Sequence, residues 1–203
     1  YDTFMEYTTK AYAASKSPLE LKYTPIHPGD MLSYGGYTFE VVLLKGHTFG
    51  QCGLYECQKK LLFVGDQIMT DIVPIVGTQE TDLGMLKCYM DSLGELKHFY
   101  KDCYFLPCHY GEIKDIEKEV NRIIFGYLEK CEIMKHVLEE AGTALTTRDI
   151  GVRTYGRSQG PPDYAHFASC TQIWAKTFSC MEYMMGEGFI ERSERDGIIY
   201  WKA

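Results

Sequence analysis

Two side chains that can do acid–base or ligand chemistry stand directly after apolar stretches of this 203-residue chain. His47 lies in the segment Gly46-His47-Thr48-Phe49-Gly50, which follows the β-branched and aromatic run Tyr37–Leu44. Asp66 follows a second apolar run, Leu61–Val64. Loops at the ends of buried strands carry functional groups because the strands hold them while their tips stay free. Taken singly, a loop His is usually only hydrogen-bonded, and an Asp after a strand is often a turn cap.

A third segment makes the combination specific. Phe105-Leu106-Pro107-Cys108-His109-Tyr110-Gly111 places another His after a short apolar run. The series G-H-T-x-G, then L-F-x-G-D, then L-P-x-H-x-G resembles the second half of the metallo-β-lactamase-fold hydrolases. The resemblance implies that His47 binds a first metal, that Asp66 bridges two metals and that His109 binds the second.

The chain departs from that family in three places. Gln51 stands where the family often has a second His, and Lys45 stands where it usually has Pro. The upstream family signature H-x-H-x-D-H does not occur, because no two of the six His are separated by a single residue. The resemblance therefore predicts an α/β protein, the C-terminal half of a metallo-β-lactamase αββα sandwich, whose N-terminal metal-binding half is absent. That the chain opens on Tyr1 agrees with the prediction of a piece of a longer protein.

The implied chemistry is hydrolysis by a metal-bound hydroxide. Divalent metals lower the pKa of bound water towards about 7. Imidazole and carboxylate suit zinc, which we favour, and also iron or manganese. The expected substrates are small esters, thioesters, lactam-like molecules or phosphodiesters, with activity absent from the isolated half. The alternative hypothesis is a non-catalytic module that binds a partner protein.

Hydrophobic patterns place these segments on a sheet. Strands are predicted at Tyr37–Leu44, Gly53–Cys57, Leu61–Val64 and Cys103–Leu106, with a helix at Thr81–Tyr100. One helix covers one face of such a sheet, so its second face is predicted to expose apolar side chains. Exposed apolar area of that size is normally an interface. The expected occupant is the missing N-terminal half or a second copy of the chain.

The remaining sequence predicts a second domain, so we divide the chain into residues 1–126 and 127–203. A long helix with a break near Gly126, a helix capped near Thr146, a helix at Phe167–Met185 and a hairpin around Asp196-Gly197 resemble a winged helix. Residues 127–203 hold nine Lys and Arg against eleven Asp and Glu. Phosphate contacts need clustered positive charge, so nucleic acid is not an expected partner.

Composition indicates a reduced, soluble protein. The net charge is −7, and no apolar run approaches the ~20 residues that span a bilayer. None of the eight cysteines belongs to a C-x-x-C pair, which argues against a zinc ribbon. We therefore predict reduced thiols, a cytoplasmic location and no membrane partner.

Overall fold

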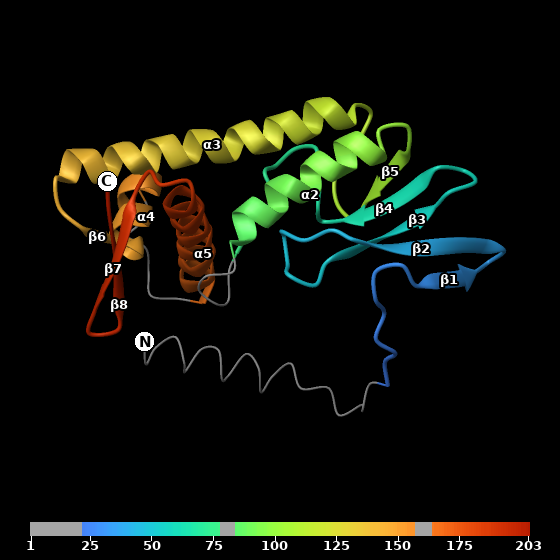
Figure 1. The fold of residues 1–203 in the computed structure, drawn as a ribbon, viewed down its shortest axis with the longest axis horizontal. Helices are drawn as coiled ribbons and strands as arrows, with labels where there is room; N and C mark the ends of the chain where they lie inside the picture. Colours follow the sequence, from blue (N-terminus) through green and yellow to red (C-terminus); the bar gives the residue numbers. More distant parts are fainter. Residues whose placement is uncertain (1–21, 78–83, 157–163) are drawn as a thin grey trace.

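The computed structural model describes residues 22–77, 84–156 and 164–203 (Figure 1). Its larger sheet has five strands in the order β1-β2-β3-β4-β5, so each strand lies beside its neighbour in sequence. Their bounds are β1 Met31–Tyr34, β2 Tyr37–Leu43, β3 Cys52–Glu56, β4 Leu61–Gly65 and β5 Tyr104–Pro107. The four predicted strands are confirmed within one or two residues at each end. The sequence prediction missed β1, which pairs with β2 through a turn at Gly35 and Gly36.

The direction of the strands decides where the loops of the candidate site lie. β2 is antiparallel to β3, β3 is antiparallel to β4, and β4 is parallel to β5. The strands β2, β4 and β5 therefore run the same way, and their carboxyl ends meet at one edge of the sheet. The segments that hold His47, Asp66 and His109 all leave from this edge.

One face of the sheet packs on helices. Helix α2 (Met85–Phe99) lies against it, and the first half of helix α3 (Ile116–Ala141) packs along α2 (Figure 1). The side chains that turn to this side are apolar and almost fully buried: Val42, Leu62, Val64 and Phe105 from the sheet, Leu86, Tyr89, Leu93 and Leu96 from α2, and Val120 and Ile123 from α3. Removing this area from water stabilises the fold by about 25 cal/mol for each Å².

The opposite face of the same sheet is apolar but partly open. Alternate residues of the paired strands turn to this side, and three of them stay exposed: Leu43 (38%), Phe63 (41%) and Tyr104 (48%). Val41, on the same face, is buried, and Phe63 packs edge-on against Phe39 with ring centroids 5.9 Å apart. The predicted exposed apolar face is therefore present, although Val41 on this face is buried.

A smaller unit follows along the chain. It comprises β6 (Leu145–Thr146), α4 (Thr147–Tyr155), α5 (Tyr164–Gly186), β7 (Glu191–Arg195) and β8 (Ile198–Lys202), with the three strands ordered β6-β8-β7. Thr146 and Asp149 form a capping box that starts α4, as the Thr146 cap predicted. The buried Trp201 donates from its indole nitrogen to Thr147 Oγ1 at 2.9 Å and so joins β8 to α4.

Helix α3 spans both units (Figure 1). Asp115 caps its start, and Gly142 ends it with the left-handed backbone that favours glycine. The predicted break near Gly126 is wrong, because the helix continues through residues 126 and 127. A Cβ at Gly126 would lie 3.0 Å from Val73 Cγ2, so the glycine serves close packing and not a kink.

The sequence also predicts a helix over residues 1–17 and a turn-rich loop over 157–163, and both lie outside the described residues. The eight cysteines all lie within the described ranges, and none forms a disulfide. None of the helices in the described ranges has the length and apolarity to cross a bilayer.

Candidate functional site

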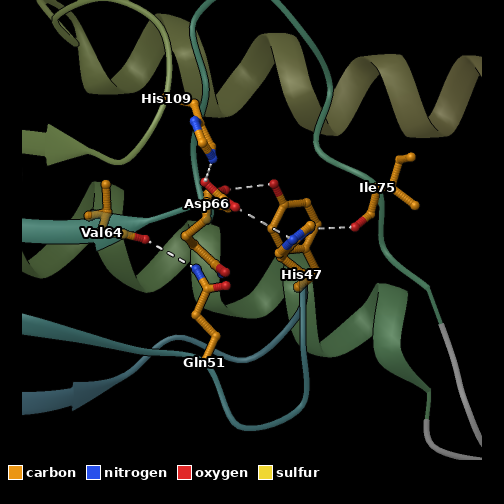
Figure 2. Close-up of polar contacts among 8 residues, drawn as sticks. His47, Gln51, Val64, Asp66, Ile75 and His109 are labelled. Carbon is orange, nitrogen blue, oxygen red and sulfur yellow. Dashed lines mark hydrogen bonds and ion pairs between the residues drawn. The ribbon is translucent and has the colours of Figure 1, made fainter. Parts of the chain in front are cut away.

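His47 lies in a tight loop that its neighbours hold from several sides. Gly46 has a φ of 145°, and a Cβ there would overlap the ring of Tyr89 on α2. Glycine is therefore required at this position, because the close approach leaves no room for a side chain. The His47 ring places Nδ1 2.8 Å from the carbonyl oxygen of Ile75 (Figure 2).

The Ile75 contact determines which His47 nitrogen is free. A carbonyl oxygen only accepts hydrogen bonds, so Nδ1 carries the hydrogen and donates it. In the neutral ring Nε2 then keeps its lone pair, and it faces Asp66 Oδ2 at 3.9 Å. Backbone carbonyls fix metal-binding histidines in this same way, by holding the other ring nitrogen.

Asp66 lies between two imidazoles (Figure 2). Gly65 turns the chain sharply after β4 with a φ of 57°, and Asp66 then projects from the edge. His109 Nε2 approaches Asp66 Oδ1 at 3.5 Å, while His47 approaches Oδ2. Asp66 Oδ1 is buried and has no hydrogen-bond partner among the described residues. A buried carboxylate oxygen without a hydrogen bond is costly, so a cation or proton between these groups would stabilise them.

His109 is held more loosely than His47. It follows β5 in a loop where the Cys108 amide donates to Gly65 O at 3.1 Å, which ties the second and third loops together. The His109 side chain is 63% exposed, compared with 27% for His47. Tyr110 next to it adopts a left-handed φ of 67° and is exposed.

A buried network, which the sequence did not reveal, joins the first two loops. Gln67 Nε2 donates to Lys45 O at 3.1 Å and to Ser92 Oγ at 3.0 Å. The Tyr89 hydroxyl donates to Gln67 O at 2.7 Å. Gln67 is fully buried directly after Asp66, so α2 fixes both loops through this one residue. A polar residue beside Asp66 was the only sequence signal, and its partners are more than twenty residues away.

Gln51 and Tyr127 support the same edge. Gln51 Nε2 donates to Val64 O at 3.1 Å, so it acts as a loop brace at the position where the family often has His. The Tyr127 hydroxyl donates to Pro74 O at 2.6 Å and accepts from Val76 N at 2.8 Å. These two bonds hold the segment that presents the Ile75 carbonyl to His47.

The structure thus brings the three predicted residues together around one carboxylate. The donor types and the free Nε2 of His47 fit a divalent metal. The three side chains do not by themselves form a metal site, because the described residues contain no group of three or more His, Cys, Asp or Glu side chains that could hold a metal ion. A metal bound here would need further ligands.

The comparisons with solved structures identify the fold. No protein-family model matches the chain. A metallo-β-lactamase family protein from Thermus thermophilus matches with a TM-score of 0.74 at 19% identity, over 98% of this chain and 65% of that one. A β-lactamase domain protein from Burkholderia ambifaria matches with a TM-score of 0.79 at 18% identity, over 99% of this chain and 57% of that one.

The chain therefore has a mixed α/β architecture with the fold of metallo-β-lactamase proteins, as the sequence predicted. It spans 57% to 65% of the length of these two similar structures.

Proposed function

We propose that this chain is part of a metal-dependent hydrolase in which His47, Asp66 and His109 are metal ligands. The observation that carries the proposal is the Asp66 carboxylate, which lies between two imidazole nitrogens and whose buried Oδ1 has no hydrogen-bond partner among the described residues. A divalent metal would supply a hydroxide at neutral pH. Zinc is the preferred metal from the donor types, with iron or manganese as alternatives. Asp66 would bridge, while the Ile75 carbonyl keeps the His47 ring oriented.

We further propose that residues outside this chain complete the ligand set. The proposal is supported by the small number of donors among the described residues and by the greater length of the two similar structures. The open face of the sheet is where an N-terminal half, or a second copy of the chain, would pack. A non-catalytic interaction module is the second candidate function, and the same exposed side chains of Leu43, Phe63 and Tyr104 favour it.

For the C-terminal part we propose a winged-helix-like domain over residues 127–203, following a metallo-β-lactamase-like domain over residues 1–126. The order β6, α4, α5, β7, β8 supports a separate C-terminal unit, which the continuous helix α3 joins to the first. Residues 127–203 hold more acidic than basic side chains, which favours a structural or substrate-covering role over nucleic-acid binding. The proposed substrates are small esters, thioesters, lactam-like molecules or phosphodiesters, handled in the cytoplasm.

The test combines metal content with turnover. The 203-residue chain is purified alone and together with an N-terminal segment that carries H-x-H-x-D-H, and each preparation is assayed for zinc, iron and manganese. We expect weak metal binding and no hydrolysis by the chain alone, and tight binding with turnover in the combined preparation. An Asp66→Asn variant should lose both properties, while Asp91→Asn on the exposed face of α2 should keep them. Metal content and turnover that are independent of Asp66 would refute the proposal.

A further inference from the structure

A pair of half-buried lysines lies between α3, α4 and α5, away from the three candidate ligands. Lys176 on α5 places its Nζ 4.8 Å from the ring centroid of Tyr127, and Lys130 on α3 places its Nζ 5.9 Å from the ring centroid of Tyr155. Both side chains are partly shielded from water. Each cation thus lies over an aromatic face and not beside a carboxylate.

Among the described residues, the surroundings of this pair contain no carboxylate counter-charge. No carboxylate within the described ranges forms an ion pair with either lysine, whereas Lys87, Lys97 and Lys135 each have one. The groups that face Lys176 are the thiols of Cys131 and Cys180 and the second lysine. Burial lowers the pKa of Lys176, Cys180 and Cys131 raise this pKa, and the charge of Lys130 lowers it.

The same cluster holds an unused hydrogen-bond donor. Tyr155 Oη is buried and has no hydrogen-bond partner among the described residues. Burial also raises the pKa of the Tyr155 phenol well above its ordinary value, so the hydroxyl keeps its proton. Two ammonium groups and a phenol together provide donors and positive charge, with no carboxylate among the described residues to receive them.

The cluster adjoins the segment that orients His47. Tyr127, whose ring lies under Lys176, bonds Pro74 and Val76 through its hydroxyl. A Cβ added at Gly77 would lie 3.5 Å from the Cβ of Ala175 on α5. Segment 74–77 therefore contacts His47 through Ile75 and the lysine cluster through its neighbours.

We propose that Lys130 and Lys176 form a binding site for a small oxyanion, the phosphate or carboxylate group of a ligand. A half-buried cation without a counter-ion costs free energy, and a bound oxyanion would remove that cost by pairing with both ammonium groups. The ordinary interpretation is that the two cation–π contacts are purely structural, each worth about 0.5 to 2 kcal/mol. The two interpretations predict opposite changes in the Tm when the charge of Lys176 is removed.

The experiment measures thermal unfolding of the 203-residue chain in sodium phosphate, sodium acetate or sodium chloride at one ionic strength, with a chelator present. A ligand that binds only the folded state raises the Tm in proportion to its occupancy. We expect the Tm in phosphate or in acetate to be higher than the Tm in chloride. The anion that raises the Tm more indicates whether the ligand group is a phosphate or a carboxylate. Lys176→Met and Lys130→Met should each weaken that binding at least about 10-fold, while Lys87→Met, an exposed control, should not change it.

The change in Tm of the Lys176→Met variant in chloride, without phosphate or acetate, provides the second readout. Lys176→Met should leave the Tm in chloride unchanged or higher, because methionine keeps the packing and removes an unpaired charge. A lower Tm for Lys176→Met in chloride would show a structural cation–π contact and overturn the proposal. Equal stability in all three salts, or phosphate binding that survives both substitutions, would also overturn it. Asp66→Asn should retain the phosphate effect, so failure of the metal proposal would be seen separately.

Discussion

The loops that present His47 and His109 differ in how firmly the protein holds them. The first loop is tied by Gln67 to α2, by Ile75 to segment 74–77 and by Gly46 to the ring of Tyr89. The third loop has one backbone bond to its neighbour, from Cys108 to Gly65, and leaves His109 mostly in water. Both imidazoles nevertheless approach the same carboxylate.

The comparison teaches that this chain preorganises one side of the candidate site and leaves the other open. Preorganised ligands cost little entropy on binding, whereas an exposed side chain must be ordered at that moment. The supports of the first loop all come from described parts of this chain. The open third loop is consistent with our proposal that further ligands complete the site.

The largest expected effect is that of Gly46→Ala. The new methyl group would overlap the Tyr89 ring, and alanine disfavours a φ of 145°. Overpacking and backbone strain each cost about 1 to 3 kcal/mol, so we expect a loss of about 4 kcal/mol in the free energy of unfolding. Urea denaturation measures this loss directly.

Gly111→Ala in the third loop is the matched control. A Cβ there would make an ordinary contact, 3.8 Å from Thr70 Oγ1, so its cost should stay within about 0.5 kcal/mol. Equal costs at positions 46 and 111 would remove the contrast between the two loops.

Next in size is Gln67→Ala. The change removes a buried hydrogen bond to Ser92 Oγ and a partly buried one to Lys45 O, and leaves both oxygens without them. A lost buried hydrogen bond that orphans its partner costs about 1 to 3 kcal/mol, so we expect about 3 kcal/mol in urea denaturation. Gln51→Ala, which loses one bond from a partly exposed side chain, should cost about 1 kcal/mol. The reverse order would show that Gln67 does not connect the first loop to α2.

Smaller effects are expected from removing single hydroxyls. Tyr127→Phe keeps the ring but leaves Pro74 O and Val76 N unpaired, at a cost of about 2 kcal/mol. Tyr89→Phe loses only the bond to Gln67 O and should cost about 1 kcal/mol. Hydrogen exchange of the Val76 amide should accelerate in Tyr127→Phe and stay slow in Tyr89→Phe. Unchanged protection in Tyr127→Phe would mean that another contact holds segment 74–77.

The strand pattern and the site edge were predictable from sequence because their signals are local. Apolar runs such as Leu61–Val64 mark buried strands, and three spaced motifs placed His47, Asp66 and His109 at strand ends. Strand β1 was missed because Met31–Tyr34 is mostly exposed and lacks a clear alternation of buried and exposed residues. The continuity of α3 through Gly126 was missed because only the packing of Val73 reveals why a glycine suits that position.

The supports of the site could not be predicted for the same physical reason. Gln67, Tyr89 and Tyr127 bond partners that lie more than twenty residues away in sequence. Nothing in the spacing of their neighbours indicates such contacts, because they depend on how α2 and α3 pack on the sheet. The resemblance of three local motifs to a known family therefore suggested the candidate ligands, and tertiary packing determines which of them is held in place.

The central proposal, that Asp66 joins two histidines in a metal site, is tested most directly by zinc titration calorimetry of the combined preparation, which includes the N-terminal segment with H-x-H-x-D-H, and of its Asp66→Asn variant. Removing a partner that only orients a ligand already costs about 10- to 100-fold in metal affinity, so losing the shared carboxylate should cost at least about 100-fold. His47→Gln should weaken binding more than His109→Gln, because only His47 is preorganised. Zinc affinity that is unchanged in Asp66→Asn would contradict the proposal.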